Sequence, residues 1–175
     1  RGDIVGARLL ARVPGAGGTA AATRRIFARK TEARVVDVSA AREFLEEHHL
    51  WRSTHAACAY GLFLDAELVA VATFTKRRNV RQRRGGIRRT HELLRFCAKR
   101  DARVIGGITK LLRAFLKDRD VDDVVTNIDR DWGGGSNWRS LGFETVEIMP
   151  PLPMALSATD GRRRFLCGRG VGVPN

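Results

Sequence analysis

Three residues have side chains and positions that suit acid–base chemistry. His49 falls near the end of an expected helix, where the neighbouring Glu47 could support its imidazole as a general base. Asp129 and Asp131 follow an expected strand, at the edge where open α/β sheets place their sites. The alternatives are a solvated helix end carrying ordinary histidines, and an internal Asp–Arg brace through Arg130.

Metal and disulfide chemistry find little support in the sequence. The histidines around His49 lack an identifiable third ligand, so no metal site is expected. The chain has 3 cysteines and no CxxC pair, which indicates neither a zinc ribbon nor a disulfide framework.

A glycine pair suggests a phosphate site. The segment Arg103-Val104-Ile105-Gly106-Gly107-Ile108 precedes the most amphipathic helix that the sequence predicts, at residues 108–116. Two glycines at a helix start let backbone N–H groups approach a phosphate, and the helix dipole favours the anion there. Strand-to-helix turns also use glycine for tight packing alone, so the pattern by itself leaves both interpretations open.

Basic residues are concentrated in three segments of a chain whose net charge is +13. Residues 1–31 carry 7 basic residues and 1 acidic residue, and the tail after Asp160 contributes Arg162, Arg163 and Arg164. The run 76–89 contains no acid and 8 basic residues: Lys76, Arg77, Arg78, Arg81, Arg83, Arg84, Arg88 and Arg89. Guanidinium groups bind phosphate oxygens bidentately, so these segments predict a nucleic-acid partner, either DNA or RNA. Simple solubility and an anionic membrane surface are the alternatives, although the segments lack the apolar face of an interfacial helix.

The elements that must position these residues form an α/β or α+β domain. Strands are expected at 33–38, 60–64, 68–74, 91–97, 121–128 and 143–148. Helices are expected after an N-cap at Ser39, at 108–116 and around Trp138. We therefore divide the 175 residues into a basic arm at 1–31, one domain at 32–156 that includes a basic loop at 76–89, and a basic tail at 157–175. The longest nearly uninterrupted apolar stretch, 56–64, is about half the length of a membrane span.

Several segments resemble the GNAT N-acyltransferase superfamily. Arg103-x-x-Gly106 followed by Leu111-Leu112 is similar to its acyl-CoA pyrophosphate loop, and the run that ends in Gly142-Phe143 is similar to the end of the same unit. A closer similarity is to GNAT-like proteins of bacteriophages, some associated with homing endonucleases and some akin to Mom-type DNA-modification proteins. Residues 27–32, 44–50, 91–97, 104–107 and 129–132 carry it.

The resemblance implies a mixed, strongly bent sheet flanked by helices, with acetyl-CoA or another acyl-CoA-like donor in a central V. The implied pyrophosphate contacts are Arg103, Ile105, Gly106, Gly107 and Ile108. Two residues depart from the superfamily pattern. Ile108 replaces a small residue of the phosphate loop, and Trp138 stands where a tyrosine usually protonates the departing thiolate. An indole N–H does not titrate usefully in water, which puts ordinary acetyl transfer in doubt.

Three functions fit these observations. The first is a GNAT-like transferase that modifies a base or an amine on DNA or RNA. The second is a catalytically degenerate GNAT-like domain that binds nucleic acid within a larger ribonucleoprotein complex, such as an organellar ribosome. The third is a small-molecule or protein N-acetyltransferase, which leaves the charge unexplained. A phage protein would act in the cytoplasm of its host, an organellar one in the matrix after removal of a transit peptide, and no membrane association is expected.

Overall fold

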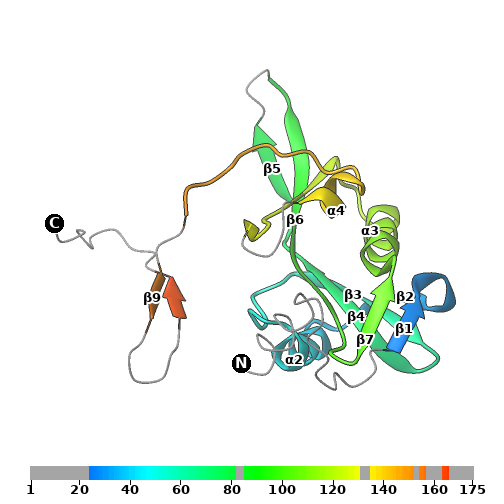
Figure 1. Ribbon diagram of the computed structural model, residues 1–175. Coiled ribbons are helices and arrows are strands. Elements are labelled where there is room, and N and C mark those ends of the chain that lie inside the picture. The colour runs from blue at the N-terminus through cyan, green and yellow to red at the C-terminus, as the bar shows by residue number, and fades with distance from the viewer. Residues whose placement is uncertain (1–23, 82–84, 131–134, 152–153, 157–162, 166–175) are drawn as a thin grey trace. The chain divides into compact units, whose positions relative to one another are not determined.

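The computed structural model describes residues 24–81, 85–130, 135–151, 154–156 and 163–165. The chain divides into two compact units, Arg1–Trp132 and Gly133–Asn175. The first unit contains the main sheet and the two longest described helices, so it provides the framework for the candidate site (Figure 1).

A mixed sheet forms the centre of the first unit. Its strands are β2 (Glu32–Val36), β3 (Cys58–Leu64), β4 (Glu67–Phe74), β5 (Arg78–Arg81), β6 (Ile87–Ala98) and β8 (Asp123–Thr126). The order is β2-β3-β4-β6-β5, all antiparallel, and β8 pairs with β6 in parallel. The predicted hairpin at 60–74 is confirmed. At its turn Asp65 adopts a φ of 55°, in the left-handed region that aspartate tolerates better than most residues.

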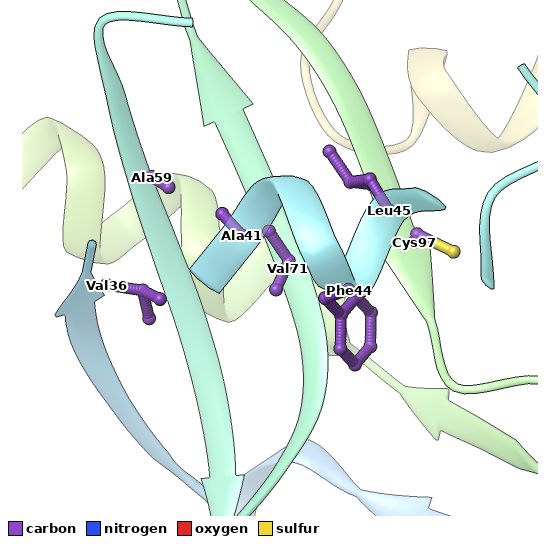
Figure 2. Close-up of a cluster of buried hydrophobic side chains, with 7 residues drawn as sticks. All are labelled: Val36, Ala41, Phe44, Leu45, Ala59, Val71 and Cys97. Atoms are coloured by element: carbon purple, nitrogen blue, oxygen red, sulfur yellow. The ribbon is translucent and has the colours of Figure 1, made fainter. Parts of the chain in front are cut away.

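Helix α2 (Val38–His48) covers one face of this sheet. Its N-cap is Asp37, whose carboxylate accepts a hydrogen bond from the Ser39 N–H at 2.7 Å, so the predicted N-cap at Ser39 is wrong by two residues. The carboxylate succeeds as a cap because it can accept from a backbone donor two residues ahead. Figure 2 shows the cluster that α2 shares with the strands: Val36, Ala41, Phe44, Leu45, Ala59, Val71 and Cys97.

Helix α3 (Gly107–Asp118) packs on the opposite face, because it contacts the alternate residues of the same strands. The Phe115 ring stacks on Phe74 with centroids 3.9 Å apart, and Tyr60 meets both rings edge-on. The Tyr60 hydroxyl accepts a hydrogen bond from Arg119 at 3.3 Å. The chain's one tyrosine is therefore a core residue of the α3 face, only 1% exposed.

A second, two-stranded sheet reaches back to the basic N-terminal segment. Strand β1 (Arg24–Phe27) pairs in parallel with β7 (Ala102–Ile105), which leads directly into α3. A 3-10 turn, η1 (Ala28–Lys30), follows β1. Part of the segment 1–31 thus forms regular structure beside the predicted phosphate turn, an arrangement that the sequence analysis does not anticipate.

The second unit contains the short helix α4 (Ser136–Arg139), which confirms the helix expected around Trp138. It also contains a hairpin of β9 (Met154–Leu156) and β10 (Arg163–Phe165). The strand predicted at 143–148 is wrong: these residues form no ladder, and Val146 is 91% exposed. Alternating apolar residues favour an extended backbone, but a strand also needs a partner edge, and sequence does not reveal one.

Candidate functional site

The N-terminus of α3 has the backbone geometry of an anion site. Gly106 caps the helix in the left-handed region, with φ 76°, a conformation that side chains rarely adopt. Its lack of a side chain leaves the first-turn N–H groups without a side-chain acceptor, and that turn holds no acidic residue. These donors and the positive end of the helix dipole point the same way, as phosphate binding requires.

The second glycine lets the helix start lie against the preceding strand. Gly107 is buried, and a Cβ added there would meet Val104 Cγ1 at 3.0 Å and Leu62 Cδ1 at 3.5 Å. Both glycines are therefore required, Gly106 by its backbone conformation and Gly107 by space.

A pocket of about 490 Å³ opens at this helix start. Three of its side chains are cationic: Arg29, Lys110 and Arg113. The Lys110 ammonium donates to the carbonyl oxygens of Ala28, at 2.9 Å, and Thr31, and so fixes the η1 turn as one wall of the pocket. The full lining is Phe27, Ala28, Arg29, Ile105, Gly106, Thr109, Lys110 and Arg113.

The predicted cofactor residues occupy different positions around this pocket. Ile105 and Gly106 line it, and Gly107 lies beneath the turn against Val104. Ile108 is half-buried in the first turn of α3, and Arg103 is exposed on β7. The sequence pattern located the turn but missed four residues of the lining: Arg29, Thr109, Lys110 and Arg113. The last three lie within the first two turns of α3.

Strands β6 and β8 separate close to the middle of β6. Thr90 and Leu93 each pair with β8 on one edge and with β5 or β4 on the other, so β8 lies on the edge of β6 opposite β4. The β8 ladder ends where Leu93 meets Thr126, whereas β4 accompanies β6 to Ala98. Among the described strands, none pairs with this edge of β6 after Leu93, as expected for a V between two parallel strands.

A polar cluster that the sequence analysis missed lies at this separation. The Glu92 carboxylate accepts hydrogen bonds from Asn127 Nδ2 at 2.9 Å and from an Arg78 guanidinium nitrogen at 3.0 Å. The Glu92 N–H donates to Thr75 Oγ1 at 2.9 Å. Each carboxylate oxygen retains a second lone pair, so the group is held in place yet able to accept a proton. Thr75 and Arg78 are 14 or more residues from Glu92 in the sequence and Asn127 is 35 residues away, so no local spacing predicts the cluster.

The predicted catalytic residues lie at the ends of elements. His49 is the C-cap of α2, and its Nδ1 accepts the Trp51 N–H at 3.1 Å, which engages the lone pair on that nitrogen. Asp129 is exposed, three residues after β8. Asp131 lies outside the described residues. The proposed base roles of these three residues remain predictions.

The basic run 76–89 is not simply a loop. Arg78–Arg81 form β5, which pairs with the first residues of β6. Arg78, Arg88 and Arg89 form ion pairs with Glu92, Asp123, Asp120 and Asp122. Hydrogen bonds from Arg89 hold the pKa of the Asp122 carboxyl far below its usual range. The run itself contains no acid, but four carboxylates from β6, from β8 and from the segment before β8 neutralise part of its charge.

The remaining residues predicted from the sequence lie either in the second unit or outside the described residues. Trp138 meets Phe143 edge-on at 5.3 Å, which explains the indole as a packing residue. Arg163 and Arg164 belong to β10, whereas Arg83, Arg84 and Arg162 lie outside the described residues. Among the described residues no group of three potential metal ligands occurs, and no described helix is long and apolar enough to cross a bilayer.

Comparison with known proteins defines the fold. No family profile and no curated protein matches the sequence. A tetramutant of the BH1408 protein from Bacillus halodurans matches the structure with a TM-score of 0.55 and 14% identity, over 70% of this chain and 99% of that one. A point mutant of the same protein gives 0.52 and 14%, over 71% and 99%. Ribosomal-protein-alanine N-acetyltransferase from Brucella melitensis biovar Abortus 2308 gives 0.47 and 19%, over 70% and 98%.

The fold is thus mixed α+β, with a bent sheet flanked by helices, and it is GNAT-like, as the resemblance implies.

Proposed function

We propose that this chain is an acyl-CoA-dependent N-acyltransferase whose acceptor amine is carried by nucleic acid. The observation that carries the proposal is the α3 N-terminus, where free backbone donors and a cationic pocket follow a turn that two glycines make possible. These features fit a pyrophosphate: the donors lack a side-chain cap, the dipole is favourable and Arg29 and Arg113 add charge.

The proposed division of labour uses two parts of the first unit. Bound acyl-CoA would supply an acyl group activated as a thioester. The Gly106–Thr109 backbone and Arg29 would hold its phosphates, while Lys110 keeps the η1 wall in place. Glu92, fixed by Arg78 and Asn127 at the separation of β6 and β8, would take the proton that the acceptor nitrogen gives up. Trp138 supplies no proton to sulfur, so CoA would leave as a thiolate that takes its proton from water.

The nucleic-acid acceptor is supported by charge. Lys76, Arg77 and Arg81 have no carboxylate partner among the described residues, and the sequence adds further basic residues at both ends. The sequence resemblance to Mom-type DNA-modification proteins of bacteriophages favours a nucleic-acid base as the acceptor. A nucleic-acid-binding subunit without catalysis is the competing function.

Calorimetric titration of acetyl-CoA into nucleic-acid-free protein tests the proposal. ATP at equal ionic strength is the control, because any polyanion can bind a surface of net charge +13. Binding should survive excess ATP and should weaken in Gly106→Ala, which forces a side chain into positive φ. Gly142→Ala is the matched control, since it carries the same strain at φ 89° outside the pocket.

The Glu92→Gln variant separates chemistry from binding. It should bind acetyl-CoA normally and lose about 10² to 10⁴-fold in acyl transfer to a nucleic-acid acceptor. Failure of the wild type to bind acetyl-CoA beyond the ATP control would overturn the enzyme and favour the binding subunit.

A further inference from the structure

The hairpin of β5 with the first residues of β6 forms a narrow ribbon, defined here as residues 78–81 and 87–90. Its register runs from Arg78 opposite Thr90 to Arg81 opposite Ile87. Gly85 and Gly86 close its tip with φ values of 87° and 90°, and a Cβ at either would meet nothing within 4 Å. Figure 1 shows the ribbon extending beyond the rest of the sheet. Its accessible end is thus two strands wide.

The basic residues near the base of the ribbon are paired with carboxylates, whereas others in the run 76–81 have no such partner in the described part of the chain. Near its base, Arg88 pairs with Asp123 at 3.3 Å, and Arg89 pairs with Asp122 at 2.6 Å and with Asp120. These pairs join the ribbon to β8 and the segment before it. Arg81 near the tip, with Lys76 and Arg77 before β5, has no carboxylate partner among the described residues. The anchored arginines therefore fix the ribbon, and the others remain available to an external anion.

The two faces of the ribbon present different side chains. Side chains alternate along a strand, so Asn79 and Arg81 share one face with Ile87 and with Arg89, which is anchored to Asp120 and Asp122 at the base. Arg78 lies on the other face, where it is committed to Glu92 at 3.0 Å. Beyond Arg89, the first face thus presents an amide, a guanidinium without a carboxylate partner in the described part of the chain, and an Ile87 side chain that is 67% exposed.

We propose that this face enters the major groove of B-form DNA, a proposal that rests on the proposed nucleic-acid acceptor. The groove is about 12 Å wide and admits a two-stranded ribbon. Asn79 and Arg81 have the side chains that pair with adenine and guanine edges, and Ile87 can contact a thymine methyl. Lys76 and Arg77 would neutralise flanking phosphates.

Other nucleic acids fit the ribbon less well. The run 76–89 contains no aromatic residue, so it lacks the stacking platform that single-strand binding uses. The major groove of an A-form RNA duplex is too deep and narrow for side chains to read. Strand β6 continues from the ribbon to Glu92, three residues after Arg89 and so about 10 Å along the strand. Glu92 lies on the Arg78 face of β6, so the groove-facing side chains and the proposed base project from opposite faces of this strand.

Fluorescence anisotropy with the full chain tests the proposal. The probes are a DNA duplex of about 20 base pairs, roughly two helical turns, the RNA duplex of the same sequence and one DNA strand. The R77Q/R81Q double variant should lower the slope of log affinity against log salt by about 0.9, for the phosphate contact of Arg77, and should lower the affinity further through the lost base contact of Arg81. The R42Q/R100Q variant removes the same charge from exposed positions outside the ribbon and should keep the wild-type slope.

Groove choice is tested by competition: methyl green, which occupies the major groove, should displace the protein, whereas netropsin in the minor groove should not. Equal slopes for the two double variants, equal affinity for the three probes or displacement by netropsin alone would each overturn the proposal. Matching thermal unfolding midpoints would show that R77Q/R81Q is folded, and Asn79→Ala, which leaves the charge intact, should weaken affinity without changing the slope. The anisotropy assay measures DNA binding without acetyl-CoA. Failure of the DNA-groove proposal is therefore distinguishable from failure of acetyl-CoA binding in the calorimetric titration.

Discussion

Adding one methyl group at Gly107, at the start of α3, should destabilise the protein. Shortening the Val104 side chain should abolish this effect of the added methyl group. In Gly107→Ala the new Cβ would lie 3.0 Å from Val104 Cγ1 and 3.3 Å from Val104 Cβ. The 3.3 Å contact needs a shift of only a few tenths of an ångström, whereas the 3.0 Å contact with Cγ1 is not easily relieved by rotation, because a β-branched side chain has few rotamers. The Val104 methyl group therefore causes most of the crowding in Gly107→Ala.

Two opposing contributions set the size of the effect. Overpacking of this kind costs about 1–3 kcal/mol. Alanine in place of glycine in a helix returns about 0.5–1 kcal/mol. We expect a net loss of about 1 kcal/mol in the free energy of unfolding, or about fivefold in the folding equilibrium. Val104→Ala alone should also cost about 1 kcal/mol, since this half-buried side chain loses two methyl groups.

The double variant Val104→Ala/Gly107→Ala tests whether the Val104 methyl group causes the strain. If the Val104 methyl causes the strain, Val104→Ala combined with Gly107→Ala should cost no more than Val104→Ala alone, a coupling of about 1 kcal/mol. Urea unfolding followed by far-UV circular dichroism measures all four proteins, and the midpoint should shift at constant m-value. Strictly additive losses would refute the Val104 methyl as the cause of the strain, and a Gly107→Ala variant as stable as the wild type would refute the requirement for a glycine.

Two further changes test the packing on each face of the sheet. Phe115→Ala should lower the free energy of unfolding by about 3–5 kcal/mol, because the ring is 0% exposed and stacked on Phe74, and chemical denaturation measures this. The adjacent Leu116→Ala, at a 49% exposed position, should change stability far less, and equal losses would contradict the assigned core. On the other face, burial lowers the pKa of His48, so the unfolded chain binds its proton more readily. Stability should therefore fall as pH drops below about 6.5, and His48→Phe should remove that slope from a series of thermal midpoints. A slope that persists in the variant would assign it to another group.

Local patterns in the sequence were enough to predict the elements that pair with their neighbours. The hairpin at 60–74 and the amphipathic helix at 108–116 depend on alternation, turn residues and helical spacing within a short window. The glycine turn before α3 was predictable for the same reason, because Gly106 and Gly107 adjoin the helix that they start. The resemblance to a known superfamily then supplied the bent sheet, which periodicity alone did not define.

Long-range pairings were not predictable. Strand β1 joins β7 across more than 70 residues, and Arg89 meets carboxylates more than 30 residues away. Net charge within the run 76–89 therefore overstated the number of cations available to a partner. The strand expected at 143–148 shows the converse limit, since a β pattern specifies the side chains of a strand and not the edge that receives it.

The hydrogen bonds from Lys110 to the Ala28 and Thr31 carbonyl oxygens have a consequence for the design of truncated variants. A deletion designed to remove the basic arm up to residue 31 would also remove β1, the η1 turn and both carbonyl acceptors of the Lys110 ammonium. The pocket at α3 would lose a wall, and a loss of ligand binding would be misattributed to charge. A truncation that ends before Arg24 removes three arginines and leaves the parallel strand pair intact, so it tests the missing positive charge alone.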